Sequence, residues 1–207
     1  MELHIQKYCT LLPGNVSVNG KKLADIDFQE SPEKSLLQTY RNLGLDYIKF
    51  FKMDNLSKLA ILAAESILKE TELYSITDKD NMAVVLANAS SSLVADTRYQ
   101  KTITDPENYF PSPSLFVYTL PNIAIGEICI KHKIYGEIVF LISKEFDSGL
   151  ICFYVNELFE NTDTHYCITG WVECNETAYE AFLLLVEKGP GGIKFDRNTI
   201  DNLFLTK

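Results

Sequence analysis

The sequence has no long apolar run and no excess of positive charge. None of its apolar runs approaches the ~18 residues that a membrane-spanning helix needs. The first 14 residues have neither a basic start nor a long apolar core, so we expect no signal peptide. Lys and Arg number 19 against 28 Asp and Glu, and the net charge of −9 argues against binding to nucleic-acid phosphates.

The cysteines are few and irregularly spaced. Their number is odd, which favours reduced thiols and a cytoplasmic protein; they are Cys9, Cys129, Cys152, Cys167 and Cys174. His165, Cys167 and Cys174 do not have the paired spacing of a zinc site, so we expect no metal. The glycine-rich residues 189–192 lack the Lys-Ser/Thr and the following helix of a phosphate-binding loop, and we expect no cofactor.

What the sequence does contain fits one α/β domain over residues 1–207, with a mixed, mostly parallel sheet covered by helices. Residues 55–70 have apolar side chains at helical spacing and predict a helix with one apolar stripe. Residues 82–87 form a short apolar run that is typical of a strand buried on both faces. Further strands are predicted at 138–143, 166–173 and 181–187, with an edge strand at 193–195 and an N-terminal hairpin with an Asn-Gly turn at 19–20. Helices are predicted near 32–44, 96–101, 114–132 (interrupted near Pro121), 147–159 and 198–205.

The chain is most informative at residues 138–159. An apolar strand, a short polar break at Lys144 and Glu145, and an apolar helix follow one another there. Many α/β enzymes place a nucleophile at such a turn, because the helix N-terminus supplies unpaired N–H groups beside it. In this sequence Phe146 occupies the turn.

Residues 121–131, PNIAIGEICIK, resemble a segment of the β-ketoacyl-acyl-carrier-protein synthases, which reads P-N-M-A-A-G-x-I-S-I-R. In that family a strand and the motif T-A-C-A-T-G-L follow, and the cysteine receives the acyl chain. When Ser148, Gly149 and Leu150 are set on the family's T-G-L, Phe146 falls where the family has its cysteine.

The resemblance covers most of residues 45–190, roughly the first half of a synthase. Four further segments follow in the family's order: 50–60 is similar to its R-F-M-D helix start, 84–93 to its V-G-V strand and loop, 168–173 to L-A-G-G-A-E, and 181–187 to A-G-V-L-V-L-E.

The resemblance implies a thiolase-like fold, of which this chain would form one half. It also implies a function without catalysis, because the reactive thiol is absent and none of the three histidines lies in the family's H-G-T setting. The chain would then be a β-ketoacyl-synthase-like subunit or acyl-binding partner in fatty-acid or polyketide (polyene-type) biosynthesis, similar to a chain-length factor. Its partner would be a second copy or a full-length synthase, with acyl-carrier protein as a further candidate. The candidate substrate-binding residues are Phe146, Ser148, Gly149, Asn122 and Ser90.

An alternative hypothesis is a small enzyme for thioester hydrolysis or acyl transfer. His165 and Cys167 are two positions apart on a predicted strand, so both would face the same side and could form a dyad. Cys152 would lie inside a helix as an inert thiol. Lys131, Lys133 and Lys144 could form a docking patch for a carrier protein, although solvated surface is the favoured interpretation.

Two expectations concern association. The strand 138–143 has no charge, proline or glycine to protect an exposed edge, and the resemblance places it at a dimer interface. The helix 147–159 is apolar around nearly its whole circumference and should be buried between layers. With one half of the fold present, we expect a partner subunit to cover its free face.

Overall fold

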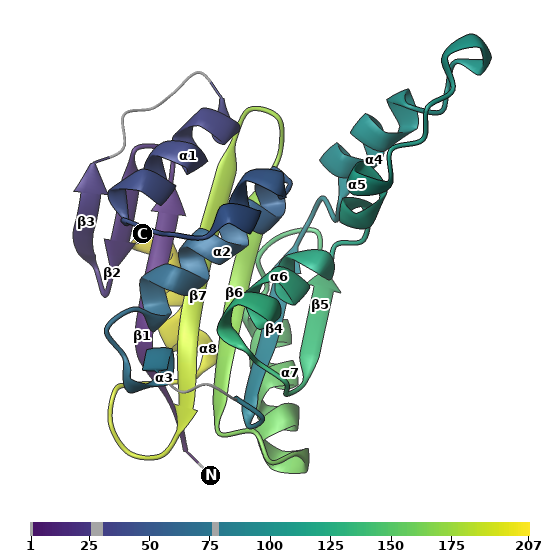
Figure 1. The fold of residues 1–207 in the computed structure, drawn as a ribbon. Coiled ribbons are helices and arrows are strands. Elements are labelled where there is room, and N and C mark those ends of the chain that lie inside the picture. Colours follow the sequence, from purple (N-terminus) through teal and green to yellow (C-terminus); the bar gives the residue numbers. More distant parts are fainter. Residues whose placement is uncertain (1, 26–30, 76–78) are drawn as a thin grey trace.

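The computed structural model describes residues 2–25, 31–75 and 79–207 (Figure 1). Within them lies one eight-stranded sheet with the order β3-β2-β1-β7-β6-β4-β5, and β8 also pairs with β1. The strands are β1 (Leu3–Leu12), β2 (Asn15–Val18), β3 (Lys21–Asp25), β4 (Met82–Asn88), β5 (Ile138–Ile142), β6 (Tyr166–Cys174), β7 (Tyr179–Lys188) and β8 (Ile193–Lys194). All the strands expected from the sequence are present, and the sheet is mixed as predicted. The expectation of a mostly parallel sheet is wrong, because among these strands β4 pairs in parallel with β5 and β6 while all the other pairs are antiparallel.

The sheet is parallel where the candidate site lies. β4 pairs in parallel with both β5 and β6, while β7 runs antiparallel to β6 and to β1. The carboxyl ends of β4, β5 and β6 therefore lie side by side at the same end of the sheet, and open α/β sheets bind their ligands beyond the carboxyl ends of such strands. All seven residues of β4 are buried, as its continuous apolar run predicts.

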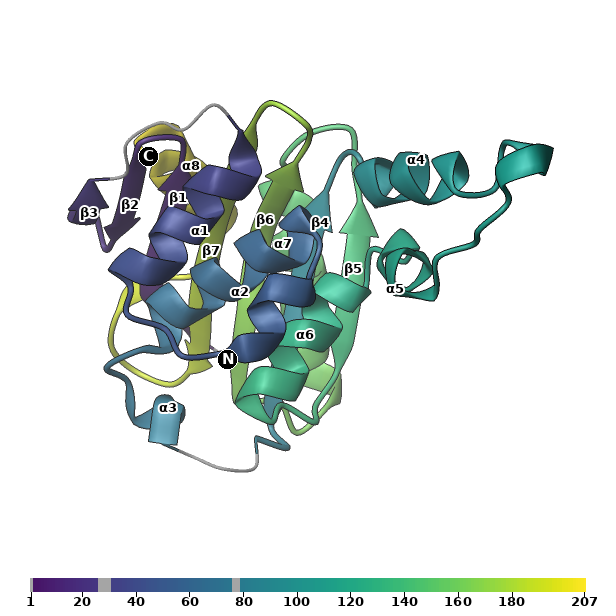
Figure 2. The same cartoon turned by 45° about the horizontal axis from the view of Figure 1, so that its top comes forward.

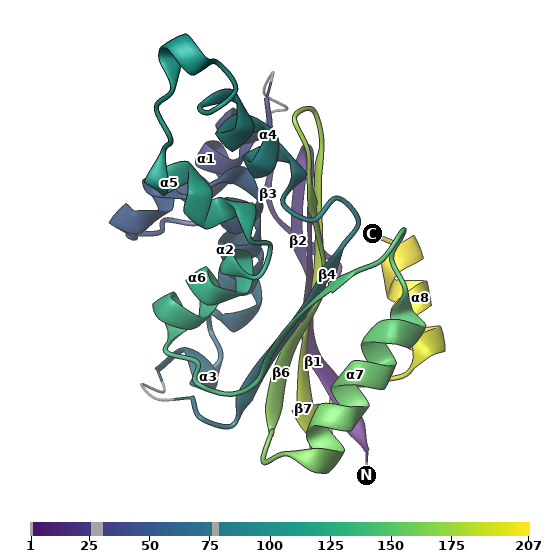
Figure 3. The ribbon, with the colours of Figure 1, turned by 90° about the vertical axis from the view of Figure 1, so that its right-hand side faces the viewer.

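Helices cover both faces of the sheet, and Figure 3 shows them edge-on as two separate layers. One layer contains α1 (Pro32–Asn42), α2 (Asn55–Leu68) and α6 (Ile123–His132), and the other contains α7 (Ser148–Asn161) and α8 (Arg197–Leu205). The remaining helical segments are η1 (Ile48–Lys52), α3 (Glu72–Ser75), α4 (Leu93–Lys101), η2 (Pro106–Asn108), α5 (Pro113–Phe116) and η3 (Val117–Thr119).

The predicted helices begin where their capping residues indicate. Ser31 accepts a hydrogen bond from the N–H of Lys34 at the start of α1, and Asp54 accepts one from Ser57 at the start of α2. The loop expected before Ser31 lies outside the described residues. α2 was predicted to bury one stripe, but all fourteen of its residues are buried, because α1, α6 and the sheet surround it.

The helix predicted at 114–132 is broken near Pro121, as expected. Pro113–Thr119 and Ile123–His132 meet at 101°, and this bent pair alone has the length and composition of a span. No single helix among the described residues is long and apolar enough to cross a membrane.

The burial predicted for α7 is wrong in extent. Only Ser148, Ile151, Val155 and Phe159 are buried, while Phe153 on the outer side is 59% exposed. The reason is that the chain's own α8 packs beside α7 on the sheet, so one flank is covered and the outer face meets solvent. The burial of this helix therefore does not by itself require a partner subunit.

Candidate functional site

The turn between β5 and α7 has the predicted strand-turn-helix form. The N–H of Ser143 donates to the carbonyl of Asn88 at 3.0 Å, which extends the β4–β5 pairing by one residue. The hydroxyl of Ser143 then donates to the carbonyl of Glu145 at 2.5 Å and tightens the turn. Asp147 caps α7 by accepting the N–H of Leu150 at 3.0 Å. Phe146 lies in this turn, immediately before the cap.

The side chain of Phe146 packs into an aromatic cluster. Its ring stacks on that of Phe204 from α8, with centroids 3.9 Å apart and planes 15° apart. It also meets Trp171 and Phe182 edge-on, at 6.2 and 5.8 Å. Three separate elements, β6, β7 and α8, thus hold one half-buried side chain, and the turn is anchored to the core.

Acidic side chains accept hydrogen bonds from the first turn of α7. Ser148 is buried, and its hydroxyl donates to Oδ1 of Asp201 at 2.5 Å. Asp201 in turn lies 3.8 Å from the guanidinium of Arg197. A catalytic helix N-terminus presents free donors to a developing oxyanion. Here the N–H of Leu150 and the hydroxyl of Ser148 are already bonded to acidic side chains, which would also repel an anion.

A polar hollow of about 310 Å³ lies beside this turn. Lys144 and Arg197 contribute positive charge to its lining, and Glu145, Asp147 and Asp201 contribute negative charge. Gly149 is next to it, and a Cβ at this position would lie 3.2 Å from a carboxylate oxygen of Asp147.

The structure brings together three of the five candidate substrate-binding residues, namely Phe146, Ser148 and Gly149. Ser90 lies at the end of the neighbouring strand β4, where Glu173 accepts its N–H at 3.1 Å and binds its hydroxyl. Asn122 immediately precedes α6 on the opposite face of the sheet, makes no capping hydrogen bond with its side chain and is exposed.

The alternative dyad receives no support from the geometry. Cys167 is fully buried, and burial raises the pKa of its thiol, so the nucleophilic thiolate is disfavoured. His165 precedes β6 and is exposed. Burial likewise raises the thiol pKa of Cys129 and Cys152 to about 11 each. Among the described residues no group of three or more His, Cys, Asp or Glu is placed to hold a metal ion.

The three lysines do not form the docking patch that the sequence left open as an alternative to solvated surface. Lys131 is mostly buried and lies 2.7 Å from a carboxylate oxygen of Glu65. Lys133 precedes β5 and Lys144 follows it, and both are exposed. Lys131 is therefore engaged inside the protein rather than available to a carrier protein.

A second feature is the open edge of the sheet. β5 ends the sheet on one side, and Ile138 and Ile142 are 46% and 52% exposed. Next to it, residues 93–120 form a projection that we call the arm, which consists of α4, η2, α5 and η3 (Figures 1 and 2). Large apolar side chains are exposed along the arm: Leu93, Tyr109, Phe110, Phe116, Val117 and Leu120.

Several of these features could not be located from the sequence. Asp201 and Phe204 lie more than 50 positions after the turn that they contact, and only the general expectation of a terminal helix pointed to them. Glu173 is the last residue of the segment that resembles L-A-G-G-A-E, but nothing in the sequence indicated that it binds Ser90.

Comparison with solved structures identifies the fold. No protein-family model and no curated protein matches the sequence. The chain is similar to a structure described as the ishigamide ketosynthase/chain length factor, at 15% identity and a TM-score of 0.64, over 91% of this chain and 63% of that one. It is also similar to a structure of the ketosynthase ApeO in complex with its chain length factor ApeC from Xenorhabdus doucetiae, at 16% identity and a TM-score of 0.61, over 92% of this chain and 81% of that one.

A third match is AntDE:AntF, a type II polyketide synthase acyl-carrier protein in complex with its ketosynthase, at 12% identity and a TM-score of 0.59, over 90% of this chain and 62% of that one. The chain spans less than two thirds of the first and third of these matched chains. At these identities the likeness concerns architecture, and it agrees with the motif order of residues 45–190. The chain has the thiolase-like α/β fold of ketosynthases and chain length factors.

Proposed function

We propose that this protein is a non-catalytic, ketosynthase-like subunit of a fatty-acid or polyketide (polyene-type) pathway, with a role similar to that of a chain length factor. The observation that carries the proposal is the turn before α7, where Phe146 stands at the position that the resemblance assigns to the acylated cysteine. Its ring is held by Phe204, Trp171 and Phe182. A side chain packed in this way stabilises the turn and has no nucleophilic atom.

The surroundings of the turn support the same proposal. An acyl-transfer site requires a nucleophile with a low pKa and free donors for the oxyanion. Near Phe146 two donors of α7, the N–H of Leu150 and the hydroxyl of Ser148, are bonded to Asp147 and Asp201. In the polar hollow three carboxylates outnumber the two cations Lys144 and Arg197, and this excess of negative charge would disfavour a thiolate as well as an oxyanion.

The partner in this proposal is a full-length ketosynthase that pairs with β5. The two edges of the sheet differ in a way that favours β5. The opposite edge strand, β3, begins with Lys21 and Lys22, and its pairing with β2 is irregular, both of which protect an edge from further pairing. β5 is apolar at every position and has no such protection. The exposed side chains of the arm would extend the same interface.

The acyl-carrier protein is the third component that we propose. One solved relative is a ketosynthase with its acyl-carrier protein bound. Because Lys131 is engaged by Glu65, we expect the carrier protein to be recruited mainly by the ketosynthase partner and not by a lysine patch on this chain.

The test has two parts. First, the purified chain is incubated with acyl thioesters and with acyl-loaded carrier protein, and its intact mass is measured. We expect no mass increase; an adduct that maps to Cys167 would support the thioester-processing alternative. Second, the gene neighbourhood is searched for a full-length ketosynthase, and that ketosynthase is assayed with and without this chain. We expect the chain to change the rate or the product length, and an unchanged assay would count against the subunit role.

A further inference from the structure

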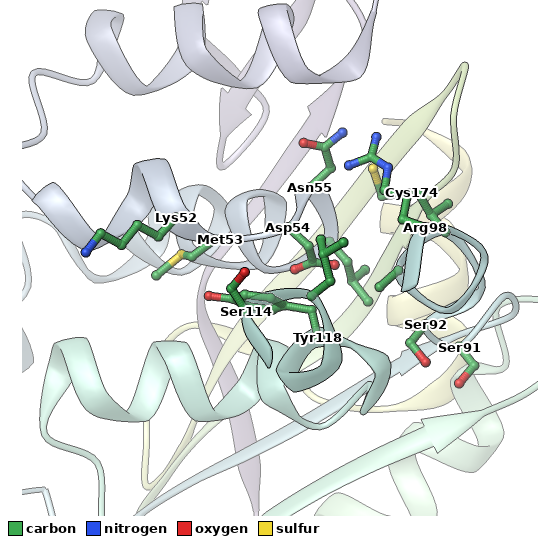
Figure 4. Close-up of a pocket in the computed structure, with 14 residues that line it drawn as sticks. Lys52, Met53, Asp54, Asn55, Ser91, Ser92, Arg98, Ser114, Tyr118 and Cys174 are labelled. Carbon is green, nitrogen blue, oxygen red and sulfur yellow. The ribbon is translucent and has the colours of Figure 1, made fainter. Parts of the chain in front are cut away.

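The arm has little packing contact with the rest of the molecule. In Figures 1 and 2 it leaves the sheet after β4 and projects beyond β5, and most of its residues are exposed. A cavity of about 120 Å³ lies between its base and the start of α2 (Figure 4). The cavity is lined on the body side by Asp54 and Leu56, and on the arm side by Val94, Arg98, Leu115 and Tyr118.

A cavity at this junction has a mechanical consequence. Close packing fixes the angle between two elements because any movement would create overlaps or voids. Where a void already separates the arm from α2, packing determines the angle less strictly. The polar contacts at the base must then contribute more of the restraint.

Two such contacts are present. The hydroxyl of Ser92 donates to the carbonyl of Thr119 at 2.7 Å and joins the outgoing and returning ends of the arm. The hydroxyl of Tyr118 donates to Oε1 of Glu127 at 3.2 Å and joins the arm to α6. The first contact closes the arm on itself, and the second one fixes it to the body.

Glu127 is built as a buried acceptor. It is only 3% exposed, and its other oxygen lies 2.6 Å from Nζ of Lys49 in η1. A buried carboxylate stays ionised when a cation of this kind compensates it, and a hydrogen bond to an ionised acceptor is stronger than one between neutral groups. Burial and the charge of Glu127 both raise the pKa of Tyr118, so its phenol keeps the proton that it donates.

We propose that Glu127 is a positioning residue, which holds the arm through Tyr118 at the angle where the arm and β5 form one surface for a partner subunit. This inference rests on the proposed function for its biological meaning. The structural part, that Glu127 and Tyr118 restrain the arm, concerns the free chain and is tested there.

The chain contains a matched control. Glu65 on α2 is 1% exposed, lies 2.7 Å from Nζ of Lys131 and 3.1 Å from Nε2 of His132, and accepts a hydrogen bond from Tyr74 at 3.4 Å. This cluster has the same groups, a buried carboxylate with a lysine and a tyrosine, and it also involves α6, which supplies Lys131 here and Glu127 in the other cluster. Its tyrosine, however, belongs to α3 and not to the arm.

The experiment compares amide hydrogen exchange of the arm in the free chain for Tyr118→Phe and Tyr74→Phe, each of which removes one hydroxyl and keeps the ring. Tyr118→Phe should speed exchange at residues 113–119 about tenfold, the ratio that corresponds to a lost hydrogen bond to a charged group, while exchange of α2 and β4 stays unchanged. Tyr74→Phe should leave exchange of the arm unchanged. Glu127→Gln, which keeps an acceptor oxygen but removes the charge, should show an intermediate increase.

The result that would overturn the inference is equal exchange of the arm in Tyr118→Phe and Tyr74→Phe. With a ketosynthase partner present, Tyr118→Phe should also weaken association by a similar factor, because a smaller fraction of molecules holds the arm in the binding orientation. If the arm loosens but the wild-type chain binds no ketosynthase, the proposed function fails and the restraint by Glu127 stands. If the wild-type chain binds the ketosynthase but Tyr118→Phe does not loosen the arm, the restraint by Glu127 fails and the proposed function stands.

Discussion

Replacing Phe146 by alanine should destabilise the fold, because the ring of Phe146 anchors the turn to the aromatic side chains of β6, β7 and α8. A fully buried phenylalanine contributes about 3–5 kcal/mol relative to alanine. Phe146 is half-buried but stacks closely on Phe204, and an aromatic pair adds about 0.5–1.5 kcal/mol. We therefore expect the free energy of unfolding to fall by about 2–3 kcal/mol and the Tm by about 5–10 °C.

The assay is urea unfolding followed by fluorescence of Trp171, which is the single tryptophan of the chain and contacts Phe146. The matched control is Phe153→Ala on α7, where the ring is 59% exposed and the expected loss is below about 1 kcal/mol. If Phe146→Ala changed the free energy of unfolding by less than about 0.5 kcal/mol, the ring would not be an anchor. Phe146 would then be free to move out of the turn, and its packing would no longer support a non-catalytic role for this site.

Three other outcomes follow from the structure. Phe146→Cys should remain unmodified after incubation with an acyl thioester, measured by intact mass, because the nearby carboxylates raise the pKa of a thiol placed there. The double variant Ile138→Lys and Ile142→Lys should abolish association with the ketosynthase, measured by light scattering, without changing the Tm by more than about 3 °C. The control variant Leu23→Lys, at an equally exposed position on the opposite edge of the sheet, should associate with the ketosynthase normally. Burial raises the pKa of Glu65, but hydrogen bonds from His132 and Lys131 outweigh it and hold the pKa below the 4.5 of a free glutamate. The ionised carboxylate of Glu65 therefore contributes fully to stability above that value, and the contribution is lost as the pH falls through the lower pKa of the folded state. The difference in unfolding free energy between wild type and Glu65→Gln should shrink on acidification below about pH 5.

The sequence predicted the elements well where the signals were local. The strand before Phe146 and the helix after Asp147 were expected from an apolar run, a polar break and a capping residue, and each lies where it was placed. The Asn-Gly turn of the N-terminal hairpin was also correct, since Asn19 and Gly20 both adopt the positive φ that such a turn needs.

The errors concern contacts between elements that are distant in the chain. Leu150, Cys152 and Phe153 made α7 look apolar on all sides, but an apolar side chain does not determine its own burial. Burial depended on α8, which covers one flank and leaves Phe153 in solvent. α2 shows the opposite case, since its polar positions, including Glu65, are buried by neighbouring helices and compensated by charges from α6.

The candidate site shows the same limit. The sequence placed Phe146 in the turn, but it could not show that Phe204 stacks on the ring or that Asp201 binds the first residue of α7. The projection of the arm could not be predicted either, because the sequence does not show that large apolar side chains such as Phe110 and Phe116 are exposed and not part of the core.

The central claim is that this chain pairs, through β5 and the arm, with a full-length ketosynthase. The most direct measurement is the molar mass, by light scattering after size-exclusion chromatography, of an equimolar mixture of this chain with the full-length ketosynthase proposed as its partner. We expect one peak whose mass corresponds to both chains in equal number for the wild type, and two separate peaks for the double variant Ile138→Lys and Ile142→Lys. A wild-type mixture that elutes as two separate species at micromolar concentration would contradict it.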